Sequence, residues 1–319
     1  MILGSAIPAP SFGSAWPVFT EMTGGPREYT VRSGDTLMAI AGRLGANWRA
    51  VAEANGLTNP DRIYPGQRLR IDTTRIIPAM QEHGIVINLS EAFLYYFEGG
   101  RLIFQAGVGL GKPGWWRTPA GAFTILKKER HPVWEVPRSI QQEMEAEGRV
   151  VLTRVPPGPD NPLGEFWLGL SLPGYGIHGT IEPSSIGQFR SHGCIRMHPE
   201  DIRLLFSLVR VGAPVQIIEE PLKIARVNGR VYLEAHPDAY SQRRNLHSEA
   251  EAVLRGLGVP IDWGRVLELL QARSGVAELV SPLLEGRSPE KAPVDRSRSR
   301  GAEHETVERT WFSSSAQEG

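Results

Sequence analysis

Residues 84–110, GIVINLSEAFLYYFEGGRLIFQAGVGL, constrain the fold of this chain most strongly. Apolar and polar side chains alternate along them, and turn signals stand at Gly99-Gly100 and in GLGKPG, residues 109–114. Alternation over short runs predicts antiparallel strands, because successive side chains of a strand point to opposite faces. Similar runs follow at 115–132, 165–172, 175–181 and 214–220. We therefore expect a mostly β domain with few helices over residues 78–220.

Helices are predicted at only a few places in this domain. The clearest is HPEDIRLLFSLVRVG, which has Pro199 in its first turn, acidic residues after it, and Gly212 past its end. Helix formers also occur in SIQQEMEAEGRV, residues 139–150, inside a long insertion that ends in the proline-rich VPPGPDNPLG.

The two ends of the chain differ from this domain in composition. Residues 1–27 are rich in Pro, Gly and Ser and predict a flexible leader. Residues 221–284 predict a C-terminal extension, in which a hairpin with Asn228-Gly229 as its turn is followed by two helical stretches. The polar, highly charged residues 285–319 predict a disordered tail.

Residues 28–72 predict a small independent α+β module with the order strand, helix, helix, strand (βααβ). The runs YTV and RLRI at its ends have β character. Between them DTLMAIAGRL has helical spacing, with Asp35 or Thr36 placed to cap it. A second short helix, WRAVAEAN, has Asn47 as its cap and Gly56 as its stop.

Three segments, YTVRSGDTLMAIA, NGLTNPDRI and YPGQRLRI, cover nearly the whole module. In this order they resemble the LysM domain, a family that binds glycans built from N-acetylglucosamine. The resemblance implies a shallow groove between two loops, formed by Gly34, Asp35, Thr36 and Leu37 on one side and by Ile63, Tyr64 and Pro65 on the other. The alternative is that GDT and YPG are only a helix cap and a turn.

Charge and cysteine content exclude several classes of function. Lys+Arg and Asp+Glu each number 35, so no net basic field favours nucleic acid or an anionic membrane as a partner. The single cysteine excludes an internal disulfide and cysteine-rich zinc sites, and no HExxH-type spacing predicts a metal. The sequence has no apolar run long enough to predict a transmembrane segment. No export signal is evident, because the N-terminal residues lack a basic region and contain several prolines.

The single cysteine, Cys194, lies in SHGCIRMHPED, residues 191–201. A lone cysteine is more often a small buried hydrophobe than a nucleophile. Three features favour catalysis here: Gly193 permits a turn that exposes the sulfur, a helix predicted just downstream would favour the thiolate through its dipole, and His178 and His192 are near in sequence. An imidazole can accept the proton of the thiol. The spacing alone leaves open which histidine is the base.

Other signals are weaker. The remaining candidate histidines stand beside glycine or proline, which indicates turns: His83, His131, His198 and His236. The segment GVGLGKPG lacks the GK[ST] ending of a phosphate loop and does not open a helix, so nucleotide binding is not expected. Trp115 and Trp116 fit either the lining of a carbohydrate or peptide cleft or aromatic packing.

The segment IHGTIEPSSIGQFRSHGCIRM resembles the signature of the L,D-transpeptidase (YkuD) family. That signature is an HGT histidine, a variable loop, and then SHGC followed by an aliphatic residue and Arg or Asn. The likeness extends through VINLSEAFLYYFEGG, VGLGKPGWWRTPAGAFTI and HPEDIRLLFSLVRVGAPVQII, and PLKIARVNGRVYLEAHPD after it resembles the extension of envelope members. The resemblance implies a β-sandwich or barrel with few helices, no metal and no organic cofactor.

The resemblance also implies roles for individual residues. Cys194 would be the nucleophile and His178 its general base and acid, with the carbonyl of Gly179 orienting the imidazole. His192, Gly193 and Cys194 would shape an oxyanion pocket through their backbone amides.

Arg196 and Ser191 match less clearly defined positions of the same signature. Arg196 would position the acyl donor or hold the loop, and Ser191 would support the turn. For both residues, a role in loop scaffolding alone is an equal alternative.

The function that the resemblance implies is a peptidoglycan L,D-transpeptidase held on its substrate by the LysM module. Cys194 would attack the carbonyl of the third residue of a stem tetrapeptide, and a diamino acid side-chain amine would resolve the thioester into a 3→3 crosslink. Such a substrate implies an extracytoplasmic location in the periplasm, cell wall or spore envelope.

The sequence leaves two alternative functions open and disfavours a third. The same residues with water as acceptor would give an L,D-carboxypeptidase or endopeptidase, and loss of activity would leave a non-catalytic wall-binding protein. An NlpC/P60-type cysteine peptidase is disfavoured, because that family has its catalytic Cys before its His, whereas His178 precedes Cys194.

Overall fold

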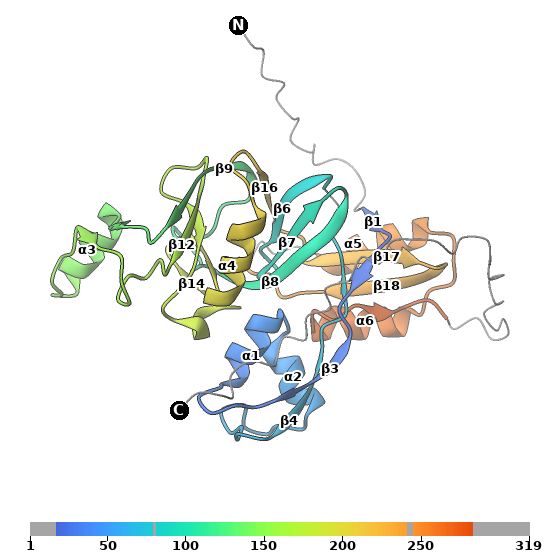
Figure 1. The fold of residues 1–319 in the computed structure, drawn as a ribbon. Coiled ribbons are helices and arrows are strands. Elements are labelled where there is room, and N and C mark those ends of the chain that lie inside the picture. Colours follow the sequence, from blue (N-terminus) through green and yellow to red (C-terminus); the bar gives the residue numbers. More distant parts are fainter. Residues whose placement is uncertain (1–16, 79–80, 241–244, 283–319) are drawn as a thin grey trace, which may run out of the picture. The chain divides into compact units, whose positions relative to one another are not determined.

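The computed structural model describes residues 17–78, 81–240 and 245–282, all of which belong to one structural unit (Figure 1). The predictions of a disordered tail at 285–319 and of a flexible start for residues 1–16 lie outside the described residues. In the described part, six α-helices accompany a larger number of strands. The mostly β architecture predicted from the alternating pattern is confirmed.

The small N-terminal module has the predicted strand–helix–helix–strand order. Strand β3 (Pro26–Thr30) pairs antiparallel with β4 (Arg68–Asp72), and helices α1 (Leu37–Leu44) and α2 (Trp48–Ala54) lie between them in sequence. The Thr36 hydroxyl caps α1 by accepting a hydrogen bond from the Ala39 amide at 3.2 Å, so Thr36 and not Asp35 is the cap. The second helix is capped by Asn47, as predicted.

The central domain is a closed β-barrel. Its nine strands are β6 (His83–Asn88), β7 (Phe93–Glu98), β8 (Arg101–Gly111), β9 (Gly121–Arg130), β12 (Phe166–Leu170), β13 (Gly176–His178), β14 (Phe189–Ser191), β15 (Ile195–Met197) and β16 (Pro214–Ile218). Their order is β14-β8-β15-β13-β12-β9-β16-β6-β7, and β7 pairs back to β8. This last pairing closes the ring, so that its strands have no free edge, and β14 is added beside β8.

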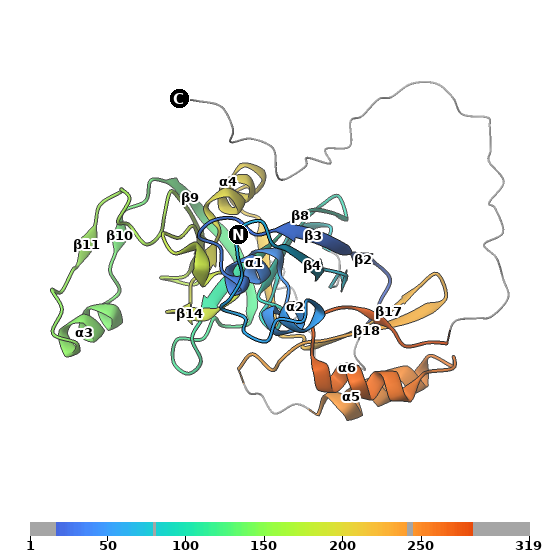
Figure 2. The same ribbon diagram turned by 90° about the horizontal axis from the view of Figure 1, so that it is seen from below.

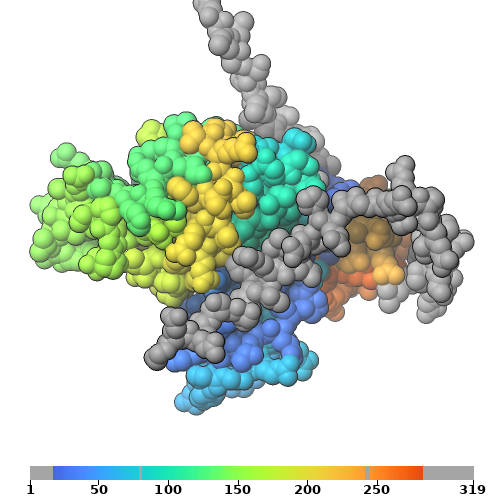
Figure 3. Space-filling view, in the orientation of Figure 1, coloured from blue at the N-terminus to red at the C-terminus, as the bar shows by residue number. Residues whose placement is uncertain are grey.

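The core of the barrel is made by the apolar faces of these strands, and one helix packs against it. Helix α4 (Pro199–Leu208) contributes Ile202 and Leu205 to the same buried cluster. It ends at Leu208 rather than near Gly212, because the backbone of Val209 is extended with φ −76° and ψ 141°. Figure 3 shows α4 in yellow on the visible surface of this domain.

The long insertion between β9 and β12 forms an arm (Figure 2). Strand β10 (Trp134–Glu135) pairs antiparallel with β11 (Arg154–Val155), and helix α3 (Arg138–Ala146) lies between them in sequence. The arm has a small apolar cluster of its own, made by Trp134, Val136, Ile140, Met144 and Val155. The helix formers at 139–150 therefore belong to an arm that packs its own interior.

The C-terminal extension packs two helices against a sheet. Strands β17 (Leu222–Val227) and β18 (Arg230–Ala235) form the predicted hairpin, and β19 (Glu278–Leu279) pairs with β18. The turn residues Asn228 and Gly229 both have positive φ, at 50° and 75°, as a two-residue hairpin turn requires. Helices α5 (Leu246–Gly256) and α6 (Trp263–Ala272) share a buried cluster with this sheet.

The prediction of a flexible leader over residues 1–27 is wrong for residues 17–27. Strand β1 (Val18–Phe19) pairs parallel with β17, and β2 (Met22–Thr23) pairs antiparallel with β5 (Arg75–Ile76). The side chain of Phe19 is buried in a cluster with Ala225 of β17. Two residues are too few to give a periodic pattern, and the partner strands are distant in sequence. The local sequence therefore does not predict these strands.

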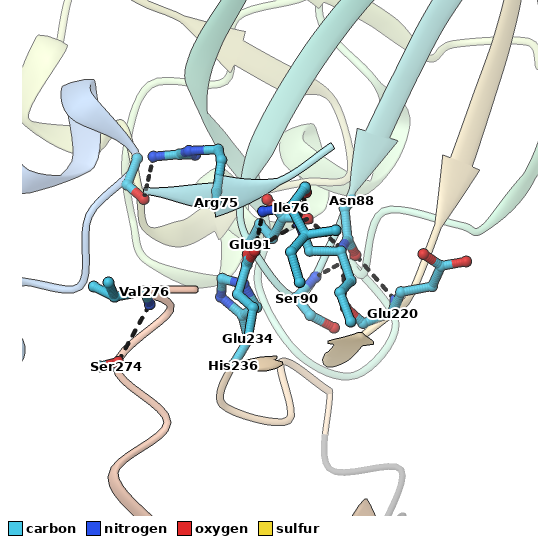
Figure 4. Close-up of polar contacts among 12 residues, drawn as sticks. Arg75, Ile76, Asn88, Ser90, Glu91, Glu220, Glu234, His236, Ser274 and Val276 are labelled. Carbon is cyan, nitrogen blue, oxygen red and sulfur yellow. Dashed lines mark hydrogen bonds and ion pairs between the residues drawn. The ribbon is translucent and has the colours of Figure 1, made fainter. Parts of the chain in front are cut away.

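Buried charges connect the segment before the barrel, the barrel and the extension (Figure 4). The ammonium of Lys223 lies 2.8 Å from a carboxylate oxygen of Glu91 and 2.9 Å from one of Glu234, and all three side chains are fully buried. Glu234 also accepts a hydrogen bond from the Ile76 amide at 2.5 Å and contacts His236 at 2.6 Å. Burial alone would raise the pKa of Glu91, but neighbouring positive charges, led by Lys223, lower it to about 2.

Helix α1 of the N-terminal module approaches the barrel closely at glycines. A Cβ on Gly107 of β8 would lie 1.9 Å from the carbonyl oxygen of Gly42 in α1. A Cβ on Gly42 would lie 2.2 Å from the carbonyl oxygen of Ile186, which follows the short helix η1 (Pro183–Ser185). The contact therefore depends on glycine at both positions.

Candidate active site

Two neighbouring barrel strands bring the predicted nucleophile and base together. Strands β13 and β15 are parallel, with Ile177 opposite Ile195 and His178 opposite Arg196. Cys194 directly precedes β15, so His178 and Cys194 are diagonal neighbours on the same face of the sheet. A nucleophile and a base that exchange a proton must share a face in this way.

The imidazole of His178 is buried and oriented. Its Nδ1 lies 2.6 Å from the carbonyl oxygen of Gly179, the partner that the family resemblance implied. Because a carbonyl oxygen only accepts, Nδ1 carries the proton in this contact and Nε2 is the basic nitrogen. Trp167 of β12 is paired with His178 of β13. Its ring stacks on the imidazole, with 5.7 Å between the two ring centres.

The electrostatic environment keeps His178 neutral. Burial is the main cause, and the positive charge of Arg196 adds to it, so that the pKa of His178 is lowered to about 4. The backbone carbonyls of Gly179 and Leu163 oppose this shift without cancelling it. At neutral pH the imidazole is therefore able to accept a proton.

The thiol of Cys194 is also neutral at rest. Burial raises its pKa to about 11, although the Gly176 amide and the charge of Arg196 lower it in part. The prediction that a helix dipole favours the thiolate is wrong, because strand β15 follows Cys194 and helix α4 begins only at Pro199. The Sγ atom lies 3.5 Å from the carbonyl oxygen of Gly174.

The turn before Cys194 is fixed by its own hydrogen bonds. Gly193 has φ +105°, and a Cβ there would lie 2.6 Å from the ring of Tyr175, so the position requires glycine. The Ser191 hydroxyl donates to the Cys194 carbonyl at 2.5 Å and accepts from the Gly193 amide at 3.1 Å. The Gly193 amide is thus engaged inside the turn and does not point freely at an oxyanion, contrary to expectation. The amide that faces the sulfur is that of Gly176.

Arg196 has contacts that suit a loop-holding role. Its guanidinium forms an ion pair with Glu182 at 3.3 Å, and Glu182 lies in the segment between His178 and Cys194. Its charge also acts on both of those side chains, as their pKa values indicate. Of the two roles considered for Arg196, this geometry favours holding the loop.

Further hydrogen bonds, which the sequence did not predict, support the loop that carries Cys194. The Thr118 hydroxyl donates to the Gly193 carbonyl at 2.9 Å and accepts from the Gly111 amide at 2.9 Å. The Tyr240 hydroxyl accepts from the Thr118 amide at 3.1 Å and donates to the Gly111 carbonyl at 2.9 Å. Tyr240 follows β18, so a residue of the C-terminal extension supports the loop that carries Cys194.

His192 faces the arm. Its Nε2 lies 2.6 Å from a carboxylate oxygen of Glu143 in α3. The other carboxylate oxygen of Glu143 lies 3.0 Å from the ammonium of Lys112, and the Trp116 ring packs edge-on against the His192 ring at 4.7 Å. This arrangement distinguishes the two histidines that the spacing left open, because His178 shares a face with Cys194 while His192 is bound to α3.

The first loop of the expected glycan groove is described at Gly34, Asp35, Thr36 and Leu37. The Asp35 carboxylate accepts hydrogen bonds from the Tyr29 hydroxyl and the Arg32 amide, both at 2.8 Å. The Leu37 side chain is only 1% exposed, so the expectation that it contacts glycan is wrong for the side chain, which belongs to the core of the module.

The opposite loop contains Ile63, Tyr64 and Pro65, and the Tyr64 side chain is 64% exposed. Gly66 after it donates to the Val31 carbonyl at 2.8 Å, which holds this loop beside the strand end that leads into the first loop. The two expected sides of the groove therefore lie next to each other.

Other candidate residues have structural partners. In the described part of the chain, Glu91, Glu234 and His236 offer possible metal-ligand atoms within 4.8 Å of one another. The ammonium of Lys223 already lies between the two carboxylates as their counter-cation. Trp115 is 97% exposed, whereas Trp116 packs on His192.

Comparisons with known proteins identify the family of the chain. A family model of the L,D-transpeptidase catalytic domain matches residues 82–217, and one of the LysM domain matches residues 29–72. The probable L,D-transpeptidase ErfK/SrfK of Salmonella typhimurium is 32% identical over 278 residues, which cover 83% of this chain and 89% of that protein. The chain belongs to the L,D-transpeptidase family.

Other relatives support the same assignment. The probable L,D-transpeptidase YbiS of Escherichia coli is 35% identical over 67% of this chain and 68% of that protein. The putative L,D-transpeptidase YkuD of Bacillus licheniformis is 33% identical over 59% of this chain and 97% of that protein. This L,D-transpeptidase therefore combines the family's catalytic domain with a LysM domain. None of the helices in the described ranges is long and apolar enough to cross a membrane.

Proposed function

We propose that this L,D-transpeptidase acts on peptidoglycan through a thioester of Cys194 and forms 3→3 crosslinks. The observation that supports the mechanism most is the pairing of β13 with β15, whose register puts Cys194 and His178 on one face of neighbouring strands. Membership of the family supports the reaction class. A substrate of this kind implies an extracytoplasmic site of action in the cell envelope.

In the first half-reaction, the Cys194 sulfur attacks the carbonyl carbon of the third residue of a stem tetrapeptide. Its proton passes to Nε2 of His178 as the carbon–sulfur bond forms, so that no free thiolate is needed. The bond to the terminal D-alanine then breaks, and His178 returns the proton to the leaving amine. A thioester of Cys194 and a neutral imidazole remain.

In the second half-reaction, the side-chain ammonium of a diamino acid from a neighbouring stem first gives one proton to solvent, and the resulting amine attacks the thioester carbonyl. The amine loses a proton to Nε2 of His178, the carbon–sulfur bond breaks, and the sulfur regains the proton. One amide has been exchanged for another, so the reaction needs no external energy source.

The tetrahedral intermediates carry a negative oxygen that needs hydrogen-bond donors. Backbone amides around Cys194 suit this role, and the Gly176 amide, which faces the sulfur, is the candidate that the structure adds. The Gly193 amide is less suited while it donates to Ser191.

The LysM module would hold the enzyme on murein by binding N-acetylglucosamine-containing glycan. Exposed Tyr64 offers a ring on which a sugar can stack, and the backbone of residues 34–37 lies next to its loop. The side chains of Thr36 and Leu37 support the module itself.

The test is product analysis with disaccharide tetrapeptide. We expect wild-type protein to form dimers with release of D-alanine and Cys194→Ala to form none. Tripeptide monomers without dimers would replace the proposal with an L,D-carboxypeptidase. Binding to murein without any product would indicate a non-catalytic wall-binding protein.

A further inference from the structure

The side-chain ammonium of Lys112 is held near the loop that carries Cys194. The Lys112 ammonium contacts a carboxylate oxygen of Glu143 at 3.0 Å and lies 5.7 Å from the centre of the Trp116 ring. The other carboxylate oxygen of Glu143 holds His192, two residues before Cys194. A carboxylate and an aromatic face together form an environment that recognises a primary ammonium.

The position of this group matches a need of the second half-reaction. An acceptor side-chain amine has a pKa near that of lysine, roughly 10.4, so it arrives as an ammonium at neutral pH. It must reach the thioester on Cys194. The arm that carries Glu143 contacts the same loop at His192, two residues before Cys194.

We propose that Glu143 and Trp116 form the binding site for the ammonium group of the acceptor, and that Lys112 occupies this site when no acceptor is bound. The inference rests on the proposed transpeptidase function and names the residues that select the acceptor. It predicts a preference for primary amines over neutral nucleophiles.

Exchange of one ammonium for another is feasible at this site. The Lys112 and Glu143 side chains are 35% and 30% exposed, and a pair open to solvent contributes little stability. The Glu143 carboxylate keeps its charge, because hydrogen bonds from Lys112 and then from His192 lower its pKa. When Lys112 leaves, its flexible side chain can be hydrated while Glu143 accepts the incoming ammonium.

The two partners of the pair should respond to substitution in opposite directions. Glu143→Gln removes the charge that attracts the acceptor and is expected to raise the acceptor KM about five-fold. Lys112→Met removes the competing ammonium and is expected to lower the acceptor KM. A pair with only a structural role would give the same direction of change for both variants.

The experiment separates donor from acceptor. The donor is a disaccharide tetrapeptide whose side-chain amine is acetylated, and the acceptor is the tripeptide stem with a free side-chain amine. Acylation is followed by intact mass, and crosslinked and hydrolysed products are quantified as the acceptor concentration is varied. Glu145→Gln, at an exposed position in the same helix, is the matched control and should leave the acceptor KM unchanged.

The outcomes distinguish this site from the proposed function. Crosslinking with the same acceptor KM in wild type and Glu143→Gln would overturn the acceptor site alone. A rise in KM in both the Glu143 and the Lys112 variants would also overturn it, in favour of a structural bridge. Hydrolysis alone by wild-type protein at every acceptor concentration would overturn the transpeptidase function together with the site.

Discussion

At the residue scale, the active site pairs two neutral groups. Burial lowers the pKa of His178 to about 4 and raises that of Cys194 to about 11, and the charge of Arg196 lowers both. At neutral pH the thiol of Cys194 therefore carries its proton. A thiol held in this way resists oxidation and unspecific alkylation, because the thiolate is the reactive form.

Alkylation of Cys194 by iodoacetamide tests this state. Because the pKa of the thiol is raised to about 11, the rate should be low at neutral pH and should still increase above about pH 10, where an ordinary cysteine is almost fully ionised. The modified fraction is measured by intact mass at each pH. A plateau at or below neutral pH would mean a thiolate–imidazolium pair and would contradict the neutral site.

The candidate site residues that the sequence predicts lie in one short motif. Cys194, His178 and Ser191 belong to such a segment, so their types and spacing identify them together. Residues that reach the site from elsewhere gave no signal: Glu143 is 49 positions from His192, and Thr118 is 75 positions from Gly193. Their contacts depend on how the barrel closes, which local periodicity does not encode.

At the element scale, the hairpin and the helices with caps were predictable, because their signals are local. The turn at Asn228-Gly229 and the caps Thr36 and Asn47 are examples. Strands β1 and β2 were missed, since two residues are too few for a periodic pattern. The functional consequence of the extension was also missed, because it depends on Tyr240, which is 122 positions from Thr118.

Tyr240→Phe tests whether the extension supports the active site. Loss of the hydroxyl removes the bonds to the Thr118 amide and the Gly111 carbonyl, so the loop that holds Gly193 should become less ordered. We expect thioester formation to slow several-fold, with a loss of stability of about 1 kcal/mol. Acylation rate and urea unfolding are measured together.

The control for this prediction is Tyr232→Phe, at a half-buried tyrosine of β18 in the same extension. It should leave the acylation rate at the wild-type value. Equal acylation rates in Tyr240→Phe and wild type would mean that the extension does not support the loop.

At the scale of the whole molecule, the buried cluster of Lys223, Glu91 and Glu234 connects the barrel to the extension. The two carboxylates share one ammonium, and all three side chains are fully buried. Since burial makes an unpaired charge costly, this cluster should fix how the connected elements pack. The boundary predicted between the β domain (78–220) and the C-terminal extension (221–284) therefore marks a change in sequence pattern. The two parts nevertheless share this buried cluster.

Lys223→Met tests this dependence. Removal of the ammonium leaves two buried carboxylates without the cation that lies between them, and the free energy of unfolding should fall by about 3–5 kcal/mol. Addition of Glu91→Gln and Glu234→Gln should recover part of that loss, and urea unfolding measures both variants. A triple variant no more stable than Lys223→Met would contradict the role of charge.

The same cluster predicts how stability depends on pH. The folded pKa of Glu91, about 2, lies below its ordinary value of 4.5. Its contribution to stability is therefore present above about pH 4.5 and is lost as the pH falls toward 2.

The most direct test of the central claim is the intact mass of the protein during reaction with disaccharide tetrapeptide. We expect a covalent adduct of the tripeptide stem, formed with loss of D-alanine and mapped by peptide analysis to Cys194. We also expect His178→Ala to accumulate this adduct far more slowly. Turnover by Cys194→Ala, or an adduct on any other residue, would rule out Cys194 as the nucleophile.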